Sequence, residues 1–144
     1  MVQDLLNSIK LKDVMTSPVI TVQEWEDFHV IYDKLETYDI RHLPVVDDSG
    51  RLVGLISQRH LYKICSPHRM ENGGWHYDKD MLDSFILKRV MLRDVYVLKP
   101  HNTVTEAIKD MAEFKVGCIP VVDDSNRPVG IVTRDSILNF ILTL

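Results

Sequence analysis

This sequence has few cysteines, no long apolar run and no excess of positive charge. Two cysteines, Cys65 and Cys118, are too few for a disulfide scaffold. No apolar run approaches the roughly 18–20 residues that a membrane span requires. The first residues lack the basic-then-apolar pattern of a signal peptide. We therefore expect a cytoplasmic protein with no membrane insertion.

The charge balance and the absent motifs exclude further classes. Seventeen basic residues against 21 acidic ones give a net charge of −4, which argues against direct nucleic-acid binding. The sequence contains no Gly-x-Ser-x-Gly elbow, no phosphate-binding Gly-x-x-x-x-Gly-Lys-Ser/Thr loop and no His-Glu-x-x-His motif. Cys65, His68 and His76 have a spacing that fits no standard zinc pattern. We expect no enzyme activity and no metal site.

What the sequence does contain is an internal repeat. Val14-Met15 recurs as Val90-Met91, the segment 44–49 (Pro-Val-Val-Asp-Asp-Ser) recurs as 120–125, and Gly54 recurs as Gly130. Each recurrence lies 76 positions later, so residues 11–64 align with 87–140 without a gap, and fourteen of these 54 positions are identical. We therefore expect an N-terminal helix at 1–10, a first repeat at 11–64, a connector at 65–86 and a second repeat at 87–144.

The two repeats also share one pattern of predicted elements. Apolar residues at helical spacing predict helices over 28–38 and 104–114. Thr103 with Glu106 forms a capping-box signature, and Asp27 is the candidate N-cap of the first helix. Hairpins are expected from strands 43–47 and 52–56, and from 119–123 and 129–132. Short strands at 19–22 and 95–98 precede each unit, and helices follow from Ser57 and from about Arg134.

Less regular segments flank the repeats. Val2, Leu5, Leu6 and Ile9 predict a short amphipathic helix. Breakers interrupt the connector, and 78–85 is expected to form a helical turn or two. The aromatic cluster at 75–77 either packs on the protein or serves as a lid or contact patch.

These residues resemble a pair of CBS domains, the tandem arrangement called a Bateman module. The resemblance is carried in the first copy by 14–16, 40–47 and 54–57, and in the second by 90–91, 116–123 and 130–133. The length, with no attached enzyme or transporter, is similar to that of stand-alone prokaryotic members. The resemblance implies an α+β fold of two pseudo-symmetric repeats, each β-α-β-β-α, packed through their sheets with Val45, Val46, Val121 and Val122 buried.

The resemblance also implies a function. CBS pairs are regulatory modules that bind AMP, ADP, ATP, NAD or S-adenosylmethionine in clefts between the repeats and signal to an effector protein. For this chain we expect an adenine nucleotide, AMP or ATP, as the regulatory ligand. The alternative is a non-catalytic interaction or dimerisation module with unoccupied clefts. A homodimer is expected, since the stripes 28–38 and 104–114 carry more apolar residues than one small sheet covers.

The resemblance places candidate ligand residues in two clefts. The preferred site, cleft B, combines apolar walls with a hydroxyl, a carboxylate and two basic side chains; its residues are Thr16, Val19, Ile20, Ile40, Arg41, His42, Pro44, Val132, Thr133, Asp135 and Ser136. Cleft A lacks a carboxylate at the ribose position; its residues are Ser57, Arg59, His60, Val95, Tyr96, Val116, Gly117, Cys118 and Pro120.

Both copies depart from the family pattern at the residue expected to hold the ribose. His60 and Ser136 stand where the family has Asp, and Asp135 comes one residue early, which turns its side chain by about 100° on a helix. Asp135 therefore either holds the ribose or only favours the helix N-terminus. Tyr96 either stacks on adenine or plugs its slot. The Asp47-Asp48 and Asp123-Asp124 pairs are interpreted as turn residues.

Overall fold

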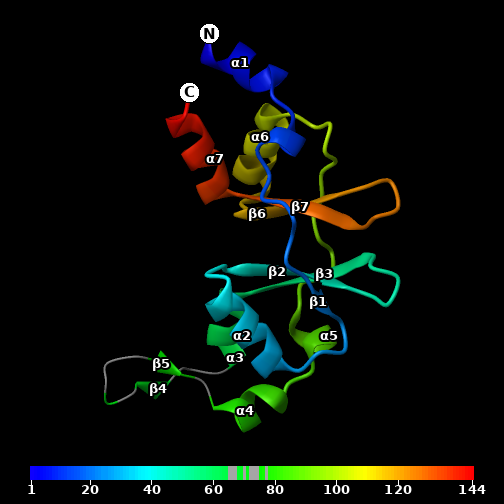
Figure 1. The fold of residues 1–144 in the computed structure, drawn as a ribbon, viewed down its shortest axis with the longest axis vertical. Coiled ribbons are helices and arrows are strands. Elements are labelled where there is room, and N and C mark those ends of the chain that lie inside the picture. Colours follow the sequence, from blue (N-terminus) through cyan, green and yellow to red (C-terminus); the bar gives the residue numbers. More distant parts are fainter. Residues whose placement is uncertain (65–67, 70, 72–74, 77) are drawn as a thin grey trace. The chain divides into compact units, whose positions relative to one another are not determined.

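The computed structural model describes residues 1–64, 68–69, 71, 75–76 and 78–144. It divides the chain into two compact units (Figure 1). Unit 1 comprises Met1–Val19, Gly50–Leu52 and Val95–Leu144, and unit 2 comprises Ile20–Ser49 and Val53–Asp94. The expectations for Cys65, for Tyr77 and for the side chains of His68, Trp75 and His76 lie outside what the structure describes.

Unit 2 contains a three-stranded sheet in the order β1-β2-β3. The strands are β1 (Val22–Gln23), β2 (His42–Val46) and β3 (Leu52–Ser57), and the helices are α2 (Phe28–Thr37), α3 (Gln58–Ile64), α4 (Lys79–Asp83) and α5 (Leu87–Val90). Strand β1 runs parallel to β2, with Val22 opposite Val45. A separate antiparallel pair joins β4 (His68–Arg69) to β5 (Trp75–His76).

Unit 1 is built around an antiparallel hairpin of β6 (Cys118–Val122) and β7 (Pro128–Thr133), in which Ile119 pairs with Val132. Its helices are α1 (Val2–Ser8), the 3₁₀ turn η1 (Leu11–Asp13), α6 (Val104–Phe114) and α7 (Arg134–Leu142). Figure 1 shows α6 and α7 with this hairpin. The α+β class and the two-repeat architecture are thus confirmed.

The strands expected at 19–22 and 95–98 are shorter than predicted. Among the described residues, the ladder with β2 in unit 2 consists of Val22 and Gln23, followed by the Glu24 amide, which donates to the Val46 carbonyl (2.9 Å); in unit 1, Leu98 bridges to Val121. The preceding residues pair elsewhere, because Thr16 exchanges backbone hydrogen bonds with Ile131 (2.9 and 3.2 Å). The chain therefore reaches the sheet of its own repeat only at residues 22–24 and at Leu98.

Most apolar residues of the α2 and α6 stripes are buried in the cores of their own units. Phe28, Ile31 and Leu35 are buried on α2, and Val104, Ala107 and Met111 are buried on α6. Only the last apolar residue of each stripe, Tyr38 or Phe114, is about half exposed. The surplus apolar surface expected from these stripes is therefore limited to their C-terminal ends, at Tyr38 and Phe114. The predicted burial of Val45, Val46, Val121 and Val122 is confirmed.

One helix cap matches its prediction and the other does not. The Thr103 hydroxyl accepts a hydrogen bond from the Glu106 amide, at 3.2 Å. Asp27 occupies the N-cap of α2, but its side chain makes no capping bond. The carboxylate of Asp83, on α4, accepts from the His29 amide at 3.1 Å instead. Helix α2 is therefore capped by a residue 54 positions away.

The leading segments of the two repeats, residues 11–19 and 87–94, are exchanged between the units. Met15 lies against Gly130 in unit 1, and Met91 lies against Gly54 in unit 2. These contacts are equivalent, since both partners are displaced by the repeat offset. Thr16 pairs with Ile131, and the equivalent Leu92 pairs with Leu55, at 2.9 Å in both directions. Each unit is thus assembled from both sequence repeats.

We predict that Gly54→Ala lowers the free energy of unfolding by about 1–3 kcal/mol, because the new methyl group overlaps the Met91 side chain. In the Gly54→Ala/Met91→Ala double variant, the added methyl occupies space that Met91 vacates. Urea unfolding of the four proteins should therefore show a destabilisation smaller than the sum of the two single effects. Additive effects would contradict the exchange.

Candidate functional site

In unit 2 the residues just before and at the start of β2 lie beside the first residue of α3, and they include three candidates, Ile40, Arg41 and His42. The Arg41 carbonyl accepts a hydrogen bond from the Gln58 amide at 2.9 Å, which fixes its backbone beside the first residue of α3. The Arg41 side chain is exposed, whereas His42 and Ile40 are half-buried. Burial, then the charge of Arg41, then that of His60, lower the pKa of His42. At neutral pH Arg41 is therefore a cation beside a neutral imidazole.

His60 folds back onto the start of α3. The Ser57 amide donates to its Nδ1 at 3.0 Å, and the Ser57 Oγ lies 2.8 Å from the same nitrogen. An amide donor requires an unprotonated Nδ1, so the ring proton resides on Nε2. Burial, followed by the charge of Lys63, lowers the pKa of His60. Ser57 is buried, and its hydroxyl is committed to this contact.

The β7–α7 junction in unit 1 repeats this arrangement with different residues. The Thr133 Oγ1 accepts from the Ser136 amide (3.1 Å), while the Thr133 amide donates to the Ser136 Oγ (2.8 Å). The Arg134 amide donates to the Gly117 carbonyl at 3.1 Å, in the place of the Gln58–Arg41 bond. Both residues that replace the family's Asp, His60 and Ser136, therefore close a helix cap.

Asp135 is the carboxylate that remains available in this segment. It is exposed in the first turn of α7. Thr16 is also exposed, and its pairing with Ile131 places it next to the strand that carries Val132 and Thr133. Unit 1 therefore brings together a hydroxyl, a carboxylate and the buried Val132 from the preferred set.

Tyr96 is tied to α6. Its hydroxyl donates to the Asp110 carboxylate at 2.8 Å, and its ring lies 4.9 Å from that of Phe114, centroid to centroid. The hydrogen bond to Asp110, then burial, raise the pKa of Tyr96. A ring held on both its edge and its face is fixed in one orientation.

The other candidates are mostly wall residues. Cys118 is buried, and burial raises the pKa of its thiol to about 12, so it is neutral and unreactive. Pro44 and Pro120 are buried in their strands, and Ile20 and Ile40 pack against the core of unit 2. Val19, Val95, Val116 and Gly117 are half-buried, and Arg59 is exposed.

Asp27, His29 and Asp83 are the group within the described residues whose ligand atoms lie close enough together, within 4.8 Å, to hold a metal ion. The His29 Nδ1 lies 2.9 Å from an Asp83 oxygen, so these two side chains already satisfy each other. The group surrounds the N-terminus of α2, whose positive end disfavours a cation. Burial alone would raise the pKa of Asp83, but the hydrogen bonds and charge of His29 lower it. The arrangement acts as a helix cap.

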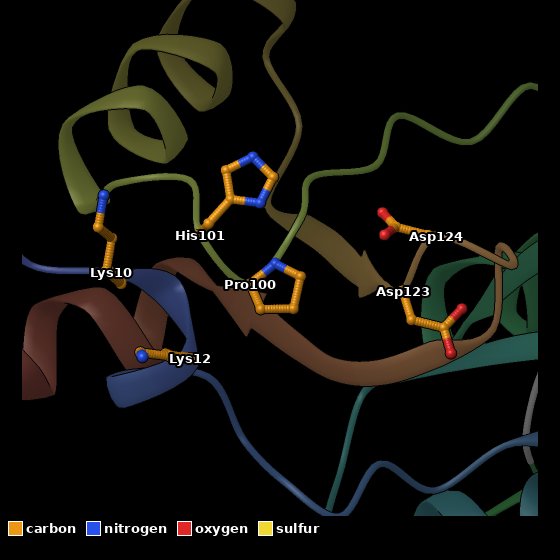
Figure 2. A pocket seen from close by; sticks show the side chains of 6 residues that line it. All are labelled: Lys10, Lys12, Pro100, His101, Asp123 and Asp124. Atoms are coloured by element: carbon orange, nitrogen blue, oxygen red, sulfur yellow. The ribbon is translucent and has the colours of Figure 1, made fainter.

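Two features of the structure are not revealed by the repeat pattern. Arg134 lies over Gly117, with its side-chain carbons and nitrogen 3.7–3.8 Å from where a Cβ would stand. A pocket in unit 1 is lined by residues from three separate stretches of the chain, 10–12, 100–101 and 123–124 (Figure 2). The sequence shows that an arginine, Arg134, stands at the first position of α7. The pocket cannot be recognised in this way, because its residues lie far apart in the sequence.

Comparison with known proteins gives a consistent family. The CBS domain family matches residues 11–66 and 87–143. A CBS domain-containing protein from Dictyostelium discoideum is 30% identical over 138 residues, which cover 93% of this chain and 92% of that protein. Inosine-5'-monophosphate dehydrogenase from Methanocaldococcus jannaschii is 34% identical over 129 residues. That match covers 90% of this chain but only 23% of the enzyme, and the homoserine O-acetyltransferases are likewise matched over about a quarter of their length.

A solved structure shares the architecture. The crystal structure of a CBS domain pair in complex with 5'-methylthioadenosine and S-adenosyl-L-methionine has a TM-score of 0.76 and 27% identity. The similarity covers 93% of this chain and 96% of that one. Within the described residues, no helix is both long and apolar enough to cross a membrane.

We predict that His60 makes stability depend on pH. The folded chain holds the pKa of His60 and of His42 below the usual 6.5, so the unfolded chain takes up protons first as the pH falls. The free energy of unfolding should be maximal above pH 6.5 and decrease between about pH 7 and 5. His60→Ser installs the residue that the second repeat uses for the same cap.

Denaturant unfolding of parent and His60→Ser at several pH values measures this effect. Over that pH interval the free energy of unfolding should decrease less steeply for the variant than for the parent. The reason is that, of His42 and His60, the variant retains only His42. Identical pH profiles would show that His60 does not contribute.

Proposed function

Because this chain belongs to the CBS domain family, we propose that it is a regulatory module that binds an adenosine-containing ligand and transmits occupancy as a conformational or assembly change. The proposal is supported by the related CBS pair, which is in complex with two adenosine derivatives. It rests most directly on one local observation: the Arg41 backbone is held beside the start of α3, and its side chain is exposed.

The candidate residues offer the chemistry that adenosine requires. Ile20 and Ile40 provide half-buried apolar surface for a flat adenine ring. Thr133 and Asp135 provide a hydroxyl and a carboxylate suited to the ribose diol. Arg41 provides a charge-assisted donor for phosphate. Because His60 and Ser136 close helix caps, we assign any ribose contact to Asp135.

Charge favours a phosphorylated ligand over a sulfonium. Arg41 is a permanent cation, and it would repel the positively charged sulfur of S-adenosylmethionine if the two approached each other. We therefore propose AMP or ATP as the ligand. Thermal-shift and calorimetric titrations with AMP, ATP, NAD, S-adenosylmethionine and adenosine test this ranking, since a ligand that binds only the folded state raises the melting temperature.

We predict that Arg41→Ala weakens AMP or ATP binding by about tenfold or more, because a direct contact with phosphate contributes roughly 1.5–3 kcal/mol. Adenosine, which has no phosphate, should bind the variant and the parent equally well. Arg89→Ala removes an exposed arginine from α5 and serves as the charge-matched control. An equal loss for adenosine and AMP, or an equal loss in the control, would contradict the assignment.

Two further variants assign the remaining groups. Ile20→Asp should weaken all adenine ligands, because it places a charge at the adenine surface. Asp135→Asn should weaken nucleotide and nucleoside alike if Asp135 holds the ribose, and should change only stability if it serves the helix end. The proposal fails if folded Arg41→Ala and Ile20→Asp variants bind every adenine ligand as the parent does.

A second candidate function is a non-catalytic interaction module. It is favoured by the helix caps at His60 and Ser136, which use the side chains that stand at the expected ribose positions. It is also favoured by apolar exposure on α7, where Leu138 is 59% and Leu142 82% exposed. We propose that this face of α7 mediates a homodimer. Light scattering should then show a dimer that Leu138→Ser/Leu142→Ser converts to a monomer; a monomeric parent at micromolar concentration excludes it.

A further inference from the structure

The pocket in unit 1 has a volume of about 340 Å³ (Figure 2). It is lined by two lysines, a histidine, a proline and two aspartates: Lys10, Lys12, Pro100, His101, Asp123 and Asp124. All six belong to unit 1, and none belongs to the candidate adenosine residues. The volume is sufficient for a small ligand.

Backbone pairing between two distant segments assembles the basic wall. The Leu11 amide donates to the Asn102 carbonyl (2.8 Å), and the Lys12 amide donates to the Pro100 carbonyl (3.1 Å). The Leu11 side chain is fully buried, whereas the lysines on either side of it are exposed. This pairing holds Lys10 and Lys12 at the same hollow as His101, as Figure 2 shows.

The basic side chains of the pocket are available to a ligand. Among the described residues, none forms a side-chain hydrogen bond or ion pair with Lys10, Lys12 or His101. The acidic wall is different, because the Lys99 Nζ donates to the Asp123 carbonyl (2.9 Å) and lies 3.8 Å from an Asp124 oxygen. The pocket therefore carries unneutralised positive charge on one side and carboxylate acceptors on the other.

The chain's own duplication provides a comparison site. At the positions equivalent to Lys10, Lys12, Pro100 and His101, unit 2 has Ile86, Lys88, Glu24 and Trp25. There the lysine is paired, since the Lys88 Nζ lies 3.8 Å from the Glu24 carboxylate.

Unit 1 differs from this arrangement in three ways. It replaces the acidic partner by Pro100 and adds two basic residues, Lys10 and His101, in place of Ile86 and Trp25. The same scaffold position is thus ion-paired in unit 2, whereas in unit 1 it carries basic side chains that have no partner among the described residues.

We infer that this pocket binds a small hydroxylated phosphate compound of the sugar phosphate class. The lysines contact the phosphate oxygens through charge-assisted hydrogen bonds. The exposed Asp124 carboxylate accepts hydrogen bonds from the hydroxyl groups. The site is separate from the proposed adenosine site and does not depend on it.

An NMR titration of the full chain with inorganic phosphate, ribose 5-phosphate and ribose, at constant ionic strength, tests the inference. Ribose 5-phosphate should produce saturable amide shifts at 10–12, at Lys99 and at 101–103. Inorganic phosphate should shift the same amides more weakly, and ribose alone should not. Lys10→Gln/Lys12→Gln should weaken ribose 5-phosphate binding at least about tenfold, and Asp124→Asn should weaken it without affecting inorganic phosphate.

Lys88→Gln is the matched control, because it removes a lysine from the equivalent position of unit 2. It should leave ribose 5-phosphate binding unchanged. The inference is overturned if no saturable shifts occur, if the double lysine variant binds as the parent does, or if the control loses as much affinity. It is also overturned if the shifts fall only at 40–42 and 133–136, which would assign binding to the proposed adenosine residues. Failure of adenosine to bind would leave it intact.

Discussion

Two methionine–glycine contacts determine which parts of the chain share a core. Met15 reaches Gly130, and Met91 reaches Gly54, because neither glycine presents a side chain. Each methionine belongs to a leading segment that also contributes a fully buried leucine, Leu11 or Leu87. Burying one leucine contributes roughly 1.5–3 kcal/mol, a substantial share of the stability of a small domain. Neither unit has a complete core without a segment from the other repeat.

The exchange of the leading segments also brings candidate ligand residues of unit 1 together. Thr16 is aligned with β7 by its pairing with Ile131, and the capped start of α7 follows that strand directly. The caps then limit which side chains can act. His60 and Ser136 satisfy the amides of Ser57 and Thr133, so a ligand would have to displace a cap to use them. Asp135, one residue earlier than Ser136, is outside that hydrogen-bond cycle.

The parts of the structure that could be predicted from the sequence are those with a local pattern. The helical spacing of Val104, Ala107 and Met111 identified α6, and Thr103 identified its cap. The capping of α2 by Asp83 could not be predicted, because a carboxylate far along the chain competes with the local Asp27. The pocket could not be predicted for the same reason, because its basic wall forms only when the distant segments 10–12 and 100–103 pair.

The position of a residue in the repeat predicts where its backbone lies better than which partner its side chain contacts. His60 and Tyr96 illustrate this limit, because each side chain is held by a neighbour, Ser57 or Asp110. Such hydrogen bonds depend on which residue occupies the neighbouring site, so the duplication alone does not reveal them.

The folding unit of this chain therefore differs from its sequence repeat. Two fragments of nearly equal length separate the alternatives: residues 20–94, which span unit 2 with Leu87 and Met91, and residues 11–86, which contain the first repeat and the connector without them. Circular dichroism during urea unfolding should show a cooperative transition for 20–94 and none for 11–86. A cooperative transition for 11–86 with none for 20–94 would contradict the account.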